Sequence, residues 1–176
     1  METNFGGTTS VASTPSLVEW KNLRFLITDA PKDNNISVYI KLFKKYNASH
    51  IVRISEPLYK KEDVEKAGIQ LHEMHFPDGD SPPDEIINKF LDLVTTVFNN
   101  PVVVDGVMPC IVVHCVAGLG RAPVLTAIAL IEQGLDAMTA VQFIRSKRRG
   151  AINSLQLAYL ETYEPRGNKG SKCSIM

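Results

Sequence analysis

The sequence has few of the features that mark secreted, membrane-spanning or metal-binding proteins. It holds only three cysteines, Cys110, Cys115 and Cys173, and this odd number argues against a disulfide-stapled chain and favours a reducing compartment. Their spacing fits no zinc site, so we expect no metal and no cofactor. No apolar run approaches the ~20 residues of a membrane-spanning helix. The N-terminal segment also lacks the apolar core of a signal peptide.

The chain has no excess of charge of either sign. Its 19 basic and 19 acidic residues cancel, so no overall field favours DNA, RNA or another nucleic acid as a partner. The composition is instead that of a globular protein, because 44% of the 176 residues are hydrophobic and 22% are charged. We predict one globular domain at residues 16–164, between a disordered N-terminal tail (1–15) and a flexible basic tail (165–176).

Strand and helix patterns alternate along this domain. Short buried strands are predicted at residues 24–29, 50–55, 69–76 and 110–114. Helices are predicted at residues 36–46, 60–68, 82–100, 121–134, 136–150 and 154–163. This order predicts an α/β fold with a central, mostly parallel sheet flanked by helices.

The segment "HCVAGLGRA" follows the last of these strands. It lies where the carboxyl end of a strand meets the amino end of a helix, and such a loop can cradle an anion. A buried cysteine or a glycine-rich turn alone is commonplace, but together with an arginine six residues on they indicate catalysis. We expect Cys115 to attack a phosphate ester as a thiolate, while Arg121 binds two phosphate oxygens. The predicted phosphate loop is Val116, Ala117, Gly118, Leu119, Gly120 and Arg121, oriented by His114.

The loop "HFPDGDSPP", residues 75–83, follows another predicted strand. Asp, Gly and Pro are common turn residues, so by itself this segment would be an ordinary turn. A departing ester oxygen needs a proton, however, and a carboxylic acid on a nearby mobile loop is a common donor. We predict that Asp78, rather than Asp80, is this acid.

These motifs resemble those of the cysteine-dependent protein tyrosine phosphatases. Residues 114–121 are similar to the family signature, and "FPD" at 76–78 resembles its Trp-Pro-Asp acid loop with phenylalanine replacing tryptophan. Together with "VRISEP", "AVQFIRSKRRGAINSLQLAYLE" and the terminal "CSIM", they resemble more narrowly the PRL phosphatases (phosphatases of regenerating liver) over nearly the whole chain. The resemblance implies a compact dual-specificity-type fold, catalysis by Cys115, Arg121 and Asp78, and phosphorylated proteins as substrates.

Two positions modify this expectation. Ala122 stands where most tyrosine phosphatases carry a Ser or Thr whose hydroxyl helps the thiolate leave. Alanine is typical of the PRL phosphatases at this position, so the resemblance implies slow turnover through a long-lived phosphocysteine. Ser55 stands where those phosphatases carry a cysteine that protects the nucleophile as a disulfide. Cys110 cannot replace that cysteine, because a strand rising about 3.3 Å per residue separates it from Cys115.

The C-terminus matches a lipidation motif. Cys173 begins a prenylation box, and the final Met176 favours farnesyl. A single lipid is a weak anchor, so Arg166, Lys169 and Lys172 would add attraction to an anionic leaflet. We expect reversible attachment to the cytoplasmic face of the plasma membrane and endosomes, and cytosolic protein when prenylation is absent.

Two functions follow from these observations, and both stay open. One is a dual-specificity or tyrosine phosphatase; the other is a pseudophosphatase-like binding module whose pocket docks the cyclin-M magnesium transport mediators that the resemblance implies as partners. The resemblance also leaves a homo-oligomer, such as a trimer, open.

The loop 116–120 contains no cation, which favours protein phosphate esters over multiply phosphorylated inositols. The basic run 145–149 is either a solvated helix end or a site that attracts acidic partners.

Overall fold

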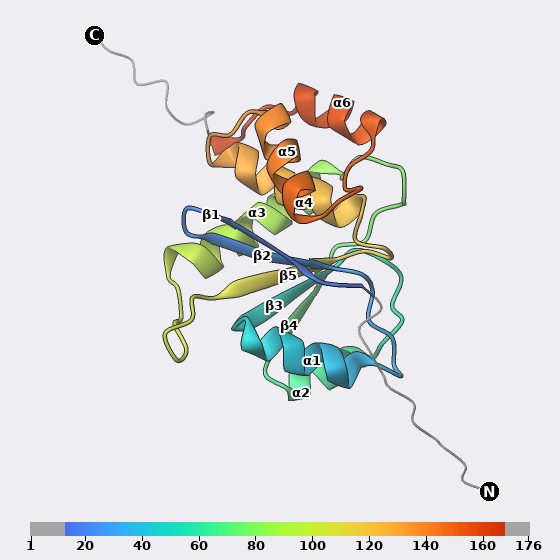
Figure 1. The fold of residues 1–176 in the computed structure, drawn as a ribbon, viewed down its shortest axis with the longest axis vertical. Helices are drawn as coiled ribbons and strands as arrows, with labels where there is room; N and C mark the ends of the chain where they lie inside the picture. Colours follow the sequence, from blue (N-terminus) through green and yellow to red (C-terminus); the bar gives the residue numbers. More distant parts are fainter. Residues whose placement is uncertain (1–12, 168–176) are drawn as a thin grey trace, which may run out of the picture.

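Five strands form one mixed sheet in the order β1-β2-β5-β3-β4 (Figure 1). The computed structural model describes residues 13–167 of the chain. The strands are β1 (Ser16–Trp20), β2 (Leu23–Thr28), β3 (Ala48–Arg53), β4 (Gln70–Glu73) and β5 (Cys110–His114). Neighbouring strands are parallel except β1 and β2, which form an antiparallel hairpin. The predicted mostly parallel sheet is confirmed.

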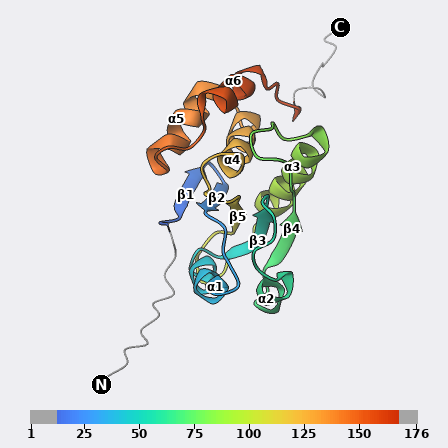
Figure 2. The same ribbon diagram turned by 90° about the vertical axis from the view of Figure 1, so that its right-hand side faces the viewer.

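Helices cover both faces of the sheet. They are α1 (Ile36–Lys45), α2 (Lys61–Lys66), α3 (Asp84–Asn99), α4 (Arg121–Glu132), α5 (Ala137–Lys147) and α6 (Ser154–Thr162). Helices α1 and α2 pack on one face, and α3 to α6 on the other (Figure 2). Side chains alternate between the faces along each strand, so Phe25 and Ile27 join the larger apolar cluster under α3 to α6, while Leu26 joins the cluster under α1.

The strand ends differ from those predicted. Strand β1 was not predicted; it is a five-residue edge strand whose apolar pattern is too short to read. Strand β3 ends two residues, and β4 three residues, before the predicted strands do, because Ile54 and Met74 are fully buried although they lie outside the strands. The backbone N–H of Ile54 donates to His114 O at 3.0 Å, and that of Met74 to Arg53 O at 2.9 Å. Burial of the chain therefore continues past the strands, toward the edge where they end.

The centre of the sheet leads directly into the loop 115–120. Strand β5 lies between β2 and β3, and all of its residues are buried. Helix α4 follows the loop and is buried over all but its last residue. Because the core holds both elements, the loop between them has rigid supports on each side.

Candidate active site

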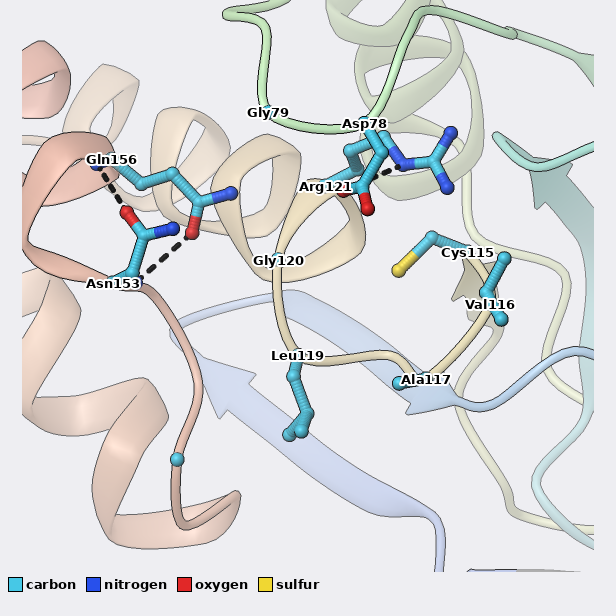
Figure 3. Close-up of a pocket in the computed structure, with 11 residues that line it drawn as sticks. Asp78, Gly79, Cys115, Val116, Ala117, Leu119, Gly120, Arg121, Asn153 and Gln156 are labelled. Atoms are coloured by element: carbon cyan, nitrogen blue, oxygen red, sulfur yellow. Dashed lines mark hydrogen bonds and ion pairs between the residues drawn. The ribbon is translucent and has the colours of Figure 1, made fainter.

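The loop 115–120 encloses one side of a pocket at the carboxyl edge of the sheet (Figure 3). Cys115 lies at the start of the loop, is 4% exposed, and points its Sγ toward the middle of the pocket. The pocket measures about 490 Å³ and is lined by Asp78, Gly79, Cys115, Val116, Ala117, Leu119, Gly120, Arg121, Gly150, Asn153 and Gln156. The fold thus brings three predicted catalytic side chains, Cys115, Arg121 and Asp78, to one place from two separate segments.

Arg121 connects the phosphate loop to the acid loop. Its side chain is 6% exposed, and its Nη1 donates to the backbone oxygen of Phe76 at 2.9 Å. Its Nε lies 3.6 Å from Asp78 Oδ1, within range of an ion pair. The Asp78 side chain is 82% exposed, so the carboxyl group remains accessible at the mouth of the pocket. Asp80 does not line this pocket, and the choice of Asp78 as the acid stays a prediction.

Gly118 is required by the shape of the loop. It adopts a φ of +71°, which disfavours side chains, and a Cβ there would lie 2.4 Å from the backbone oxygen of Thr28. The same Cβ would lie 2.8 Å from Nη2 of Arg148. The loop therefore packs directly against the end of β2 and against a buried arginine.

Arg148 holds the phosphate loop from the side opposite the pocket. It is 6% exposed, and its Nε donates to Gly118 O at 2.7 Å while its Nη2 donates to Ala117 O at 3.0 Å. Its Nη1 also donates to Ser16 Oγ at 3.2 Å. Both interpretations of the basic run 145–149 are therefore wrong for this residue, which is neither solvated nor free to attract a partner. Sequence reasoning missed it because its partners lie about 30 and 130 residues away.

His114 orients the backbone of the nucleophile. It is fully buried, with Nδ1 3.1 Å from Cys115 O and Nε2 2.7 Å from the hydroxyl of Tyr59. A carbonyl oxygen only accepts, so Nδ1 carries the proton and Nε2 accepts from Tyr59. Burial lowers the pKa of His114 to about 4, so the ring is neutral at pH 7. This geometry fits the predicted orienting role, and Tyr59 is a partner that the sequence did not indicate.

The two positions that modify the expected mechanism, Ala122 and Ser55, are both buried. The methyl group of Ala122 is inaccessible to solvent. Ser55 is 2% exposed, and its Oγ has no hydrogen-bond partner among the described residues. Cys110 and Cys115 are free thiols at opposite ends of β5. Burial raises the pKa of Cys110 to about 12, so its thiol stays protonated and unreactive at pH 7.

Helix α6 contributes two pocket residues that sequence reasoning missed. The side chain of Asn153 accepts from the N–H of Gln156 at 2.8 Å, and Gln156 Oε1 accepts from the N–H of Asn153 at 3.0 Å. This capping box leaves Gln156 Nε2 facing Gly120, 3.0 Å from where a Cβ would lie. The "NSLQ" pattern indicates the start of a helix, but not that this helix end borders the pocket.

Within the described residues 13–167, no group of three or more His, Cys, Asp or Glu side chains could hold a metal ion. Over the same range, none of the helices combines the length and the apolar character that crossing a bilayer requires. Cys173, Lys169 and Lys172 lie outside the described residues.

Comparisons with known proteins agree with this geometry. The model of the family "Protein-tyrosine phosphatase" matches residues 25–163. A probable protein tyrosine phosphatase type IVA A of Dictyostelium discoideum is 48% identical over 161 residues, covering 92% of this chain and 93% of the relative. The PRL-1 phosphatase of Drosophila melanogaster is 44% identical and covers 92% of each chain. A solved structure of a Leishmania major protein tyrosine phosphatase superposes with a TM-score of 0.77 at 36% identity, covering 86% of this chain and 99% of that one.

Proposed function

The chain belongs to the protein-tyrosine phosphatase family, and within it to the PRL (type IVA) phosphatases; from this premise we propose how its residues carry out the reaction and where it acts. It is a cysteine-dependent protein tyrosine phosphatase. We propose that it dephosphorylates proteins through a slowly hydrolysed phosphocysteine. The observation that carries this proposal is the convergence of Cys115, Arg121 and Asp78 on one pocket.

In the first step, Cys115 Sγ attacks phosphorus as a thiolate, forming the S–P bond while the ester P–O bond breaks. Asp78 gives its proton to the departing oxygen, which leaves as an alcohol or phenol. Arg121 and the loop backbone stabilise the charge that spreads over the other phosphate oxygens. In the second step, water attacks phosphorus and gives a proton to the Asp78 carboxylate, while the S–P bond breaks; inorganic phosphate leaves, and the Cys115 thiolate and the protonated Asp78 are restored.

Slow turnover is proposed from Ala122. Its methyl group offers the departing thiolate no hydrogen bond in the second step. The nearest hydroxyl on the same helix is that of Thr126, which donates to Ala122 O at 3.0 Å and is therefore engaged elsewhere. Dephosphorylation of the enzyme, rather than attack on the substrate, then limits kcat.

The covalent mechanism is tested with Cys115→Ser. A serine hydroxyl stays protonated in this pocket, so hydrolysis of a generic aryl phosphate should fall by at least about 10³-fold. Mass spectrometry of wild-type protein quenched during turnover should find phosphate on Cys115. Near-native rates in Cys115→Ser, or an unphosphorylated Cys115, would show that the mechanism is wrong.

A second candidate function is a binding module that regulates cyclin-M-type magnesium transport mediators. The observation that favours it is the apolar rim of the phosphate loop, where Val116 is 58% and Leu119 39% exposed, since exposed apolar residues around a pocket suit contact with a protein. In this candidate, an acidic loop of the mediator docks in the pocket and phosphocysteine blocks it. Binding of a cyclin-M-type cytosolic domain, compared between unphosphorylated and phosphorylated Cys115, tests it.

Attachment to the cytoplasmic face of the plasma membrane and endosomes, through a farnesyl group on Cys173, is the third part of the proposal. Its electrostatic support is smaller than the sequence suggests, because Arg166 forms an ion pair with Asp84 and a hydrogen bond with Asn88. The lipid must therefore supply most of the affinity. Cys173→Ser should move the protein to the cytosol; the mass of the C-terminal peptide and sedimentation with membranes measure this.

A further inference from the structure

A small groove continues from the active-site pocket, between the acid loop and α6. It measures about 150 Å³ and is lined by Gly79, Asp80, Ser81, Val124, Leu155, Gln156 and Tyr159. Gly79 and Gln156 line both the groove and the pocket. The labelled view shows Gly79 on the acid loop and Gln156 on α6 (Figure 3). A segment of chain whose phosphate occupies the pocket can therefore extend into the groove.

Helix α6 supplies the apolar wall of this groove. Leu155 and Tyr159 are four residues apart, so they share one face of the helix. Leu155 is 80% exposed. Leu155 lies in the groove beside the pocket, while the exposed Val116 and Leu119 line the pocket itself. A single exposed leucine needs no explanation, but a cluster of such residues around a pocket indicates a contact surface.

We propose that the groove is a subsite for one apolar side chain of the substrate, aliphatic or aromatic, near the phosphorylated residue. This inference rests on the proposed phosphatase function. The groove measures about 150 Å³, the volume of a cavity that holds a benzene-sized group, so it has room for one side chain and not for a longer segment. Val124, Leu155 and Tyr159 form its apolar part, and its other lining residues are polar or glycine. Asp80 on its rim repels an acidic side chain at the same position. The groove therefore selects an apolar over an acidic neighbour of the phosphoresidue.

The groove lies away from the reacting atoms, so its contacts stabilise the bound substrate and the transition state alike. Its effect should appear in peptide affinity and in kcat/KM, which reports on steps up to phosphoryl transfer. The kcat, limited by hydrolysis of phosphocysteine, should not depend on the flanking residue. An apolar side chain in such a pocket gives about tenfold discrimination.

The experiment uses phosphotyrosyl peptides that carry Leu, Ala or Asp at each of three positions on either side of the phosphotyrosine. For wild-type protein, we expect one position at which kcat/KM is about tenfold higher with Leu than with Asp. In Leu155→Ser this ratio should fall clearly below the wild-type value, although not to one, because Asp80 still repels an acidic side chain. Val102→Ser is the matched control, because Val102 is 71% exposed and lies before β5, at the opposite edge of the sheet. It should keep the wild-type ratio.

Peptide dissociation constants measured on Cys115→Ser, with and without Leu155→Ser, give a second readout that needs no turnover. The proposal is overturned if no position prefers Leu, or if Leu155→Ser keeps the wild-type ratio. An equal loss in Val102→Ser would also overturn it. Wild-type protein that hydrolyses no phosphate ester would refute the proposed function instead, and the dissociation constants would still decide whether the groove selects apolar side chains.

Discussion

At the scale of single residues, the proposal of a slowly hydrolysed phosphocysteine rests on Ala122. Ala122→Ser introduces a hydroxyl next to Arg121, where it can donate to the departing thiolate and lower the barrier to hydrolysis. A tenfold faster decay would require only ~1.4 kcal/mol. Single-turnover decay of phosphocysteine and steady-state hydrolysis, measured on the same variant, should both accelerate.

Ala122→Gly is the control for this variant, since it changes the same position without adding a donor. If phosphocysteine decays at the wild-type rate in Ala122→Ser, then Ala122 does not limit turnover, and the account of a slow phosphatase loses its physical basis. Stronger binding of a cyclin-M-type domain during turnover by Ala122→Ser would favour the switch in which phosphate blocks docking.

At the scale of elements, the acid loop is positioned by contacts with α4. Arg121, the first residue of that helix, donates to Phe76 O and lies next to Asp78. We expect a phosphate group bound by Arg121 to compete with the ion pair between Arg121 and Asp78. Asp78 would then be free to face the departing oxygen of the substrate, where a proton donor is required.

Asp78→Ala should slow phosphorylation of Cys115 by substrates with poor leaving groups at least about tenfold more than by activated aryl esters, which need little protonation. The measurement is the dependence of kcat/KM on the pKa of the leaving group. Asp80→Ala should keep the wild-type dependence. The opposite pattern between the two variants would show that Asp80 is the acid.

At the scale of the whole molecule, three buried or half-buried histidines make stability depend on pH. Burial lowers the pKa of His114 to about 4, and lowers the pKa of His50 and His72, whose rings share a hydrogen bond of 2.9 Å. The neighbouring His72 lowers the pKa of His50 further, and Lys89 and Lys61 that of His72. All three rings are therefore neutral in the folded protein near pH 7.

The unfolded chain binds a proton on each of these histidines more tightly than the folded protein does. The contribution of the neutral rings to the free energy of unfolding is therefore fully present above the ordinary histidine pKa of about 6.5, and it is lost as the pH falls below that value. His114 alone should cost about 2 kcal/mol of unfolding free energy by pH 5. Urea unfolding at pH 7, 6 and 5 measures this loss. His50→Gln should make the dependence shallower, whereas an unfolding free energy that stays constant from pH 7 to 5 would contradict the neutral state of these rings.

The sequence by itself determined the parts of this protein that depend on neighbours in the chain. Strand β5, helix α4 and the glycine-rich loop between them are local features, because an apolar run, a glycine with positive φ and an apolar helix follow one another directly. The chemistry of Cys115 and Arg121 could be predicted for the same reason, since only five residues of loop separate them. The edge strand β1 was missed, because its short apolar pattern becomes meaningful only when paired with β2.

Only the tertiary structure decided which distant residues complete the site. Arg148, at the C-terminal end of α5, donates hydrogen bonds to the phosphate loop. Tyr59 donates to Nε2 of His114 and so fixes which ring nitrogen carries the proton, and Gln156 lines the pocket from α6. In the sequence each has an equally good local explanation, as a solvated cation, a loop aromatic or a helix cap. Their roles depend on where the packed core places the helices, and that placement follows from burial summed over the whole domain, which no short segment of the sequence contains.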